Sequence, residues 1–412
     1  MVGGHGEHAG GDARAIGGHE PTFLVVTVCM GRQGSGRPPA PGRRDDQAAD
    51  PEKPGLTWGY GDVITQAAAD AARARREHFG EFYGLRPLAP AGRPVVLVHG
   101  NCQAGSVRRL LETAGACAVR VPPVHELETE DLGHLARLAG RAEALVTQPV
   151  RADYRDLPVG TEQVAALLPA GAPVVVFPVL RFAGIFPFQV TVRPSCAGSV
   201  DPPVVPYHDL RLLLAARESR RYARRLPFPR ALRLVEELTG AVDPAAVGRL
   251  TADSLMRMRR RERAHDAVAA SAVLAAMLPA QRTHHTLNHP TNAFLTGVAP
   301  LVIRRLAEAG FALDPAPEAP DAQMLGGIRA PVTAAARAAF PGVPAQQWSG
   351  PGWQVDGVRV PEEEVARAQL AWYTRHPGFV DAGLARHAGT LKLLGLTEAL
   401  DGARRRRPEA RG

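Results

Sequence analysis

Long apolar runs are missing from this sequence of 412 residues. The best candidate, 23–30 (FLVVTVCM), is far shorter than the roughly 20 apolar residues that a membrane-spanning helix needs. It also lacks the basic start and the small-residue cleavage site of a secretory signal. We therefore expect no membrane span and a cytoplasmic protein.

Cysteine is scarce as well. The four cysteines, at positions 29, 102, 117 and 196, form no C-x-x-C pair and are not spaced from histidines as in a zinc site. This distribution argues against a disulfide scaffold and against a bound metal. Among the four, only Cys102 lies in a turn that would expose it to a ligand.

Lysine is almost absent: the chain has two lysines, and its net charge of +8 comes nearly all from arginine. Clustered basic residues can indicate a nucleic-acid partner. Here the arginines accompany much alanine, glycine and proline, which we interpret as a result of GC-rich coding, and we expect no nucleic-acid partner. A non-catalytic basic protein that binds nucleic acid or acidic glycan stays open as an alternative.

Two common nucleotide-binding motifs are also lacking. The sequence has no G-x-x-x-x-G-K-[ST] loop and no G-x-G-x-x-G directly after a strand. ATP and dinucleotide chemistry therefore have no support from the sequence.

The composition divides the chain into four parts. Residues 1–60 are a low-complexity mixture of Gly, Pro, Asp and Arg that we expect to be a disordered tail. Residues 61–92 are expected to form a helix, over 62–83, and a Pro/Gly-rich linker. An α/β catalytic domain with a helical second half is expected over 93–310, and a C-terminal extension over 311–412, in which Pro361 opens a helix.

From residue 94, short apolar segments alternate with amphipathic ones. The expected strands are 95–99, 117–121, 144–148 and 174–178, and the expected helices are 104–114, 129–141 with Thr129 as N-cap, and 161–168. Alternation of this kind predicts an α/β fold in which a parallel sheet has flanking helices on both faces.

The second half of the expected domain is helical. Helices are expected at 207–225, 230–239, 251–277 and 290–309, and Gly310 suits the C-terminal cap of the last one.

Cys102 lies where the first expected strand passes into a helix, in the stretch VVLVHGNCQAGS. Ligands of open parallel sheets bind outside the carboxyl ends of the strands. Gly100 allows a tight turn, and the free N–H groups of the helix start can stabilise an oxyanion or a thiolate. The alternative is a small residue that fills space beneath the turn.

Polar side chains at the same sheet edge are further candidates. Asn101 and Gln103 flank the cysteine, and Gln148 ends the third expected strand, so each could donate to a carbonyl oxygen or bind a sugar hydroxyl. Arg151 and Tyr154 follow and could line the same crevice. The alternative for each is a loop residue that satisfies backbone groups.

A cysteine nucleophile needs a base, usually histidine. His208 and His289 are the best placed of the fourteen histidines, because each lies in a polar motif between a loop and a helix. His208 is followed by Asp209, which could orient it, and His289 follows Asn288. Both motifs could instead only cap helices, and the sequence does not rank the two histidines.

The segment VVLVHGNCQAGSVRRLL resembles the opening motif of the WcbI-like family of polysaccharide-biosynthesis proteins, which are regarded as acetyltransferases of capsular sugars. Four further pieces follow in the order of that family: VTQPVRADY at 146–154, FPVLRFAGIFP at 177–187, PYHD at 206–209 and LNHPTN at 287–292, which ends at Asn292. The resemblance implies a coenzyme A-binding enzyme with a three-layer core like that of SGNH hydrolases or Rossmann folds. A serine of those hydrolases is replaced by Cys102.

Coenzyme A carries phosphates, so the resemblance also implies a basic patch. Residues 256–265 (MRMRRRERAH) offer arginines for it, among them Arg257 and Arg260, although such a run is usually a solvated helix face. The function that we predict is transfer of an acyl group, most simply from acetyl-CoA, to a hydroxyl of a carbohydrate acceptor. Cys102 could carry the acyl group or only line the thioester site, in which case a histidine activates the acceptor hydroxyl for direct transfer. A thioesterase or esterase, with water as acceptor, is the alternative within the same chemistry. The oligomeric state is not indicated by the sequence.

Overall fold

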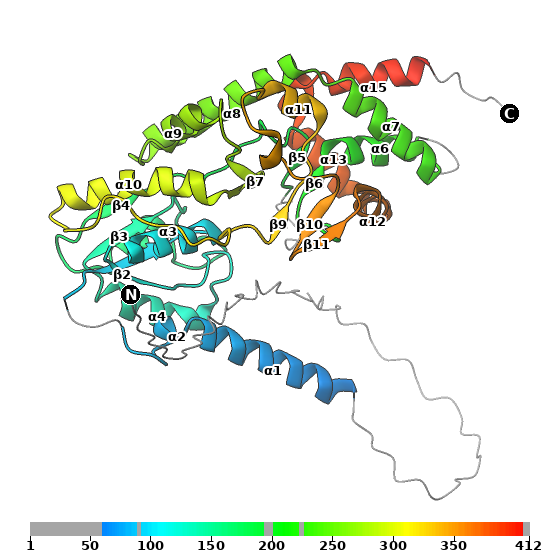
Figure 1. Cartoon of the computed structure of the whole chain (residues 1–412). Coiled ribbons are helices and arrows are strands. Elements are labelled where there is room, and N and C mark those ends of the chain that lie inside the picture. The colour runs from blue at the N-terminus through cyan, green and yellow to red at the C-terminus, as the bar shows by residue number, and fades with distance from the viewer. Residues whose placement is uncertain (1–59, 89–91, 193–200, 222–225, 407–412) are drawn as a thin grey trace, which may run out of the picture. The chain divides into compact units, whose positions relative to one another are not determined.

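The computed structural model describes residues 60–88, 92–192, 201–221 and 226–406 (Figure 1). The predicted tail over 1–60 lies outside these residues except for Tyr60, as do Cys29 and Cys196. Residues Gly59–Gly412 form one compact unit. No helix in the described ranges is long and apolar enough to cross a membrane.

A four-stranded parallel sheet lies at the start of this unit. Its strands are β1 (Val95–His99), β2 (Cys117–Val119), β3 (Ala144–Thr147) and β4 (Val174–Val176), in the order β2-β1-β3-β4. All four follow the predicted strands within two residues at either end. Val96, Leu97 and Val98 of β1 are buried on alternating faces of the sheet, which is why the strand reads as a continuous apolar run.

Helices cover both faces of the sheet (Figure 1). On one face, α3 (Cys102–Thr113) and α10 (Asn292–Glu308) pack in the same core cluster as Val96 and Val98. On the other face, Leu97 packs with residues of α2 (Gly80–Tyr83), α4 (Leu132–Ala139) and α5 (Thr161–Ala165). The predicted three-layer α/β core is confirmed.

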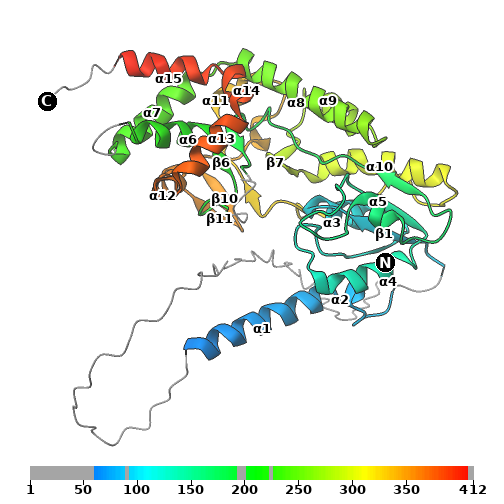
Figure 2. The same ribbon diagram turned by 180° about the vertical axis from the view of Figure 1, so that it is seen from behind.

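The rest of the unit is mainly helical (Figure 2). Its helices are α6 (Leu210–Ser219), α7 (Phe228–Gly240), α8 (Pro244–Ala264), α9 (Ala270–Met277), α11 (Ala334–Ala339), α12 (Glu362–Arg375), α13 (Pro377–Arg386), α14 (Ala388–Leu393) and α15 (Leu396–Arg405). The C-terminal helices α12 and α13 pack on α6, and α15 packs on α7, so their apolar side chains join the larger core cluster.

The described part of the unit also contains two short strand pairs and a small three-stranded sheet. They are β5 (Gln189–Val190) with β6 (His208–Asp209), β7 (His284–Thr286) with β8 (His289–Pro290), and the antiparallel sheet of β9 (Ile328–Arg329), β10 (Trp353–Val355) and β11 (Val358–Val360). The predicted helix 207–225 therefore begins later, at Leu210, and the predicted helix 290–309 begins at Asn292 with Thr291 as its N-cap.

The single helix expected over 251–277 is wrong, because the structure has two helices with a break after Ala264. Glu262, near the end of α8, accepts hydrogen bonds from the amide and hydroxyl of Ser271 at 2.6 and 2.5 Å. Val268 donates to the carbonyl of Val176 in β4 at 2.9 Å. These tertiary hydrogen bonds outweigh the local helix propensity.

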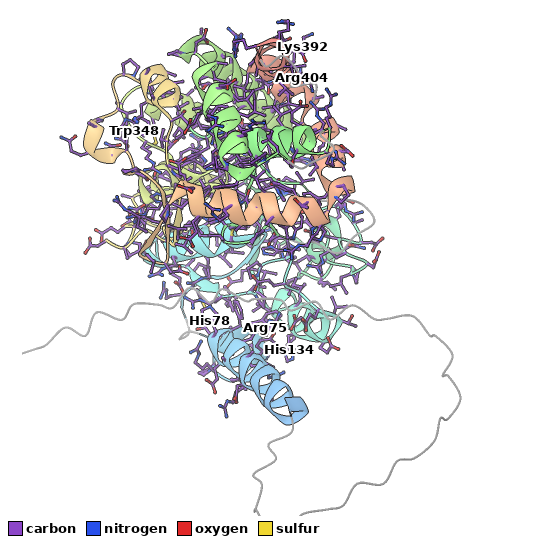
Figure 3. All side chains as sticks on the ribbon, turned by 90° about the vertical axis from the view of Figure 1, so that its right-hand side faces the viewer. Arg75, His78, His134, Trp348, Lys392 and Arg404 are labelled. Carbon is purple, nitrogen blue, oxygen red and sulfur yellow. The ribbon has the colours of Figure 1, made fainter. Side chains whose placement is uncertain are left out.

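The N-terminal helix α1 (Tyr60–His78) is fixed at its end by Arg75, which Figure 3 labels together with His78. Arg75 forms an ion pair with Asp131 at 2.8 Å and donates to the carbonyl of Glu126 at 2.9 Å. Glu128, not the predicted Thr129, is the N-cap here, in a capping box with Asp131. These bonds fix the loop that follows β2.

Candidate functional site

Cys102 is the first residue of α3 and follows β1 after a two-residue turn. The chain moves to one side of β1 to form β2 and to the other side to form β3, so the order of strands reverses next to β1. In open α/β sheets this reversal is where ligands bind. Gln148 directly follows β3, the strand beside β1, and so lies at the same edge of the sheet.

The turn before the cysteine depends on Gly100 and Asn101. Asn101 caps α3 by accepting from the amide of Gln103 at 2.9 Å, and its own amide donates to Oε1 of Gln148 at 2.9 Å. A Cβ atom on Gly100 would lie 2.6 Å from that oxygen. Glycine is therefore required by the close approach of the Gln148 side chain.

Gln103 is fully buried, and its side-chain amide joins three loops. Its nitrogen donates to the carbonyls of Leu180 and Asn288 at 2.8 and 2.7 Å. Its oxygen accepts from the amide of Leu180 at 2.9 Å and from Gln148 at 2.8 Å. The side chains of Gln103 and Gln148 are thus engaged within the protein, which favours the structural alternative over direct ligand binding.

The thiol of Cys102 is partly buried and lies near Glu126. Burial, and then the negative charge of Glu126, raise its pKa from the usual 9.0 to about 11, although the amides of Cys102 and Gln103 act in the opposite direction. The amides of the helix start thus favour the thiolate, as expected, but burial and the charge of Glu126 outweigh them and raise the pKa overall. The two amides do point at the sulfur, as predicted for oxyanion donors.

Glu126 was not identified from the sequence. It lies in the loop after β2, and the amide of Val124 in this loop donates to the carbonyl of Gly100 at 2.8 Å. Glu126 could have been proposed from its position after the strand that neighbours β1, because neighbouring parallel strands end at the same edge of the sheet.

Alkylation of Cys102 by iodoacetamide is expected to rise about tenfold per pH unit up to roughly pH 10, because only the thiolate reacts. A pKa of about 11 leaves no plateau near neutral pH. Mass spectrometry of the peptide that contains Cys102 measures the rate at each pH. A plateau below about pH 8 would contradict this description of the thiol.

Glu126→Gln is expected to lower the pKa of Cys102 and to speed its alkylation at a fixed pH about two- to fivefold. One charge in a partly exposed setting contributes roughly 0.5–1 kcal/mol, and removing it favours the thiolate. Glu130→Gln changes an exposed carboxylate of the same chain region and serves as control. An unchanged rate in Glu126→Gln would show that the carboxylate does not act on the sulfur.

Tyr207 lies near enough to Cys102 to interact with it electrostatically, and it was also missed as a site residue. Its hydroxyl donates to Oδ1 of Asn288 and is hydrogen-bonded to Oγ1 of Thr286, both at 2.7 Å. Burial is the main cause that raises the pKa of Tyr207, and the nearby Cys102 adds to it. Asn288, a predicted site residue, is thereby held between Tyr207 and Gln103.

His289 packs edge-on against Tyr207, with ring centroids 6.2 Å apart. Its Nδ1 atom is buried and has no hydrogen-bond partner among the described residues. Burial lowers the pKa of His289 to about 4, so the imidazole is neutral at pH 7. A neutral imidazole with an unpaired nitrogen, next to Tyr207 and Asn288, has the chemistry of a general base.

His208 lies in a different setting. Its Nδ1 is hydrogen-bonded to the hydroxyl of Tyr373 at 2.7 Å, and its ring centroid lies 4.6 Å from that of Phe379. Burial lowers its pKa to about 4. The hydrogen bond and ring contacts of the His208 side chain are to α12 and α13, and no described contact joins it to Cys102.

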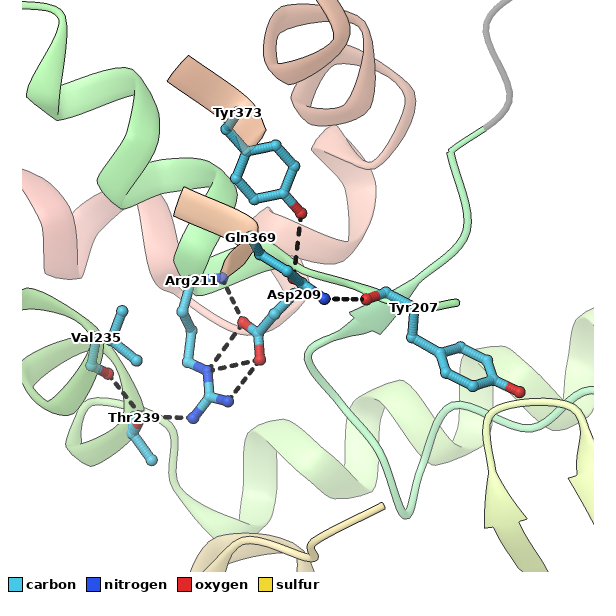
Figure 4. A network of polar contacts seen from close by, with 7 residues as sticks. All are labelled: Tyr207, Asp209, Arg211, Val235, Thr239, Gln369 and Tyr373. Carbon is cyan, nitrogen blue, oxygen red and sulfur yellow. Dashed lines mark hydrogen bonds and ion pairs between the residues drawn. The ribbon is translucent and has the colours of Figure 1, made fainter. Parts of the chain in front are cut away.

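The carboxylate of Asp209 is bonded to Arg211 (Figure 4), so it does not orient His208. This carboxylate caps α6 by accepting from the amide of Arg211 at 2.8 Å and pairs with the guanidinium of Arg211 at 2.5 Å. The prediction that Asp209 orients His208 is therefore wrong, and the alternative, in which Asp209 caps the following helix, describes the structure. Arg211 also donates to Thr239 at 2.7 Å, and Gln369 donates to the carbonyl of Tyr207 at 2.9 Å, which ties the site to α7 and α12.

The remaining predicted binding residues lie elsewhere. Asn292 donates to the carbonyls of Pro320 and Ala322 and accepts from the amide of Met324, so its side chain holds that loop. Arg257 is exposed and pairs with Asp253 at 2.7 Å, and Arg260 is exposed on the same helix. No described contact brings these three residues to Cys102.

A parallel sheet covered on both faces, with a thiol, a phenol and a neutral imidazole at its topological switch point, defines an α/β enzyme with a polar site at the carboxyl ends of its strands. The chain belongs to the WcbI family of polysaccharide biosynthesis enzymes, whose family model matches residues 95–310. Family membership thus confirms the resemblance of the motifs.

A solved structure of WcbI has the same fold, with a TM-score of 0.61 and 18% sequence identity over 75% of this chain and 99% of that chain. It is described as a novel polysaccharide biosynthesis enzyme, in its native form without a disulfide bond between CoA and a cysteine. No curated protein matches the chain in sequence.

Proposed function

We propose that this protein transfers an acyl group, most simply acetyl, from coenzyme A to a hydroxyl group of a carbohydrate in the cytoplasm. The observation that carries the proposal is the position of Cys102 beside two backbone amides and near Tyr207, which in turn contacts Asn288 and His289. Membership in a family of polysaccharide biosynthesis enzymes supports a carbohydrate acceptor. CoA in the description of the WcbI structure supports the donor.

In the first half of the proposed reaction, the thiol proton of Cys102 passes to Nδ1 of His289 and the sulfur attacks the carbonyl carbon of the thioester. The bond from that carbon to the sulfur of CoA breaks, and CoA leaves as a thiol with the proton from His289. A base is required because the pKa of Cys102 is raised to about 11.

In the second half, the acceptor hydroxyl gives its proton to His289 and attacks the acyl group on Cys102. The bond to the cysteine sulfur breaks, and His289 returns the proton to the thiol. In both halves the amide of Cys102 is the main donor to the oxyanion, because the amide of Gln103 also donates to Asn101.

The test is release of free CoA from acetyl-CoA in the presence and absence of carbohydrate acceptors. We expect acceptor-dependent release that is lost in Cys102→Ala and kept in Cys117→Ala, a matched control because Cys117 is the other cysteine of the described residues and is buried in β2. Equal release without any acceptor would favour the thioesterase alternative. Absence of CoA binding by the unmodified protein would refute the proposed donor.

A further inference from the structure

Arg282 is a buried guanidinium whose charge is not balanced by a carboxylate. It is 7% exposed and donates to neutral groups: the carbonyl of His284 at 2.8 Å, the carbonyl of Gln347 at 3.1 Å and the hydroxyl of Ser349 at 2.6 Å. In the described part of the chain it has no ion-pair partner. Burial, and then the charge of Arg329, lower its pKa to about 10.

Arg329 brings a second positive charge to the same place. It lies on β9, and the amide of the next residue, Ala330, donates to the carbonyl of His285 at 2.9 Å. Arg329 is partly exposed, and its Nε donates to the carbonyl of Gly326 at 3.3 Å. Its terminal nitrogens form no ion pair among the residues described.

Two imidazoles lie near these arginines. Burial lowers the pKa of His285 most, and the nearby charges of Arg282 and Arg329, and then His289, lower it further. His285 is 5% exposed, and its Nε2 is hydrogen-bonded to Gln323 at 3.0 Å, whereas its Nδ1 has no partner in the part of the chain that the structure describes. His289, on the paired strand β8, has the same unpaired Nδ1. A buried polar atom without a partner calls for an explanation, and a bound molecule is one of the possible explanations.

We propose that Arg282 and Arg329, together with His285 and His289, form a site for a phosphate-bearing ligand whose reactive end lies at Cys102. The proposal rests on the proposed function, and it names the chemistry that holds the substrate. Guanidinium groups bind phosphate oxygens through charge-assisted hydrogen bonds, and the charge of a phosphate balances the buried Arg282. The unpaired nitrogens of the imidazoles accept from a hydroxyl of the ligand.

The phosphate has two sources in this reaction, the phosphates of CoA and those of a phosphorylated or nucleotide-linked sugar. Binding of CoA, pantetheine, pyrophosphate and UDP-glucose is measured by calorimetry on the full chain. The variants are Arg329→Gln, Arg329→Lys as the conservative rescue, and Arg337→Gln as a control that removes an exposed arginine of α11. Arg329 is preferred to Arg282 because it is only partly buried.

We expect Arg329→Gln to weaken binding of at least one phosphate-bearing probe about tenfold, as is typical when a hydrogen bond to a charged group is lost. Pantetheine, which has no phosphate, is expected to bind unchanged, and Arg329→Lys to recover part of the affinity. A loss for CoA alone assigns the phosphate to the donor. A loss for pyrophosphate and UDP-glucose alone assigns it to the acceptor.

Two results would overturn the site: unchanged binding of every phosphate-bearing probe by Arg329→Gln, or no binding of any of them by the unmodified protein. The proposed function fails separately. If the unmodified protein binds neither CoA nor pantetheine but binds pyrophosphate through Arg329, the donor is wrong and the phosphate site stands.

Discussion

His289→Ala is expected to lower the rate of acyl transfer about 10²- to 10⁴-fold, whereas His208→Ala is expected to leave the rate of the folded enzyme near its original value. General-base catalysis contributes about this much. His289 lies beside Tyr207 with an unpaired nitrogen, but His208 is hydrogen-bonded to Tyr373 and packed against Phe379. The turnover number of each variant measures the difference. We expect His208→Ala mainly to lower the thermal unfolding temperature, which is measured on the same variants.

The pH dependence gives an independent check on the same histidine. The pKa of His289 is lowered to about 4 by burial, so the basic form is present at neutral pH and is lost only as the pH falls toward 4. We therefore expect no loss of activity between pH 8 and about 6 from this group. For the two alanine variants, a larger loss of turnover in His208→Ala than in His289→Ala would assign the general base to His208 instead.

Gln103→Leu is expected to lower the free energy of unfolding by about 3–5 kcal/mol. The substitution leaves four buried groups without their partner: the amide and carbonyl of Leu180, the carbonyl of Asn288 and the side-chain nitrogen of Gln148. Each unsatisfied buried group costs roughly 1–3 kcal/mol, and the costs are not fully additive. Urea unfolding followed by circular dichroism measures the change.

The matched control is Gln281→Leu, because Gln281 is exposed and such positions usually tolerate substitution within about 0.5 kcal/mol. A destabilisation of less than about 1 kcal/mol in Gln103→Leu would mean that the loops around Cys102 are held by other contacts.

The sheet and the place of Cys102 could be predicted because both depend on local pattern. Apolar segments of three to five residues between amphipathic helices define parallel strands, and the turn chemistry of Gly100 and Asn101 marks the end of β1. His289 and Asn288 could be proposed from their motif for the same reason.

The partners of the site residues could not be predicted, because they come from distant parts of the chain. His208 is hydrogen-bonded to Tyr373. The carboxylate of Asp209 is bonded to Arg211 and is therefore not available to orient a histidine. Asn292 is occupied by the loop at 320–324. Tertiary contacts alone therefore decide which motif residues lie at the site and which ones only stabilise the surrounding loops.

The state of the cysteine shows why a local rule failed. A helix start favours a thiolate by roughly 0.3–1 kcal/mol at an exposed position. Burial of the sulfur and the charge of Glu126 act against this and raise the pKa to about 11. Neither burial nor Glu126 is visible in the turn sequence itself, so the sign could be found only from the fold.

Intact-mass measurement after incubation with acetyl-CoA, without an acceptor, tests the central claim most directly. The account predicts one added acetyl group on Cys102, found also in Cys117→Ala and lost in Cys102→Ala. Transfer to an acceptor by a protein that never gains this mass, at a rate unchanged in Cys102→Ala, would contradict it.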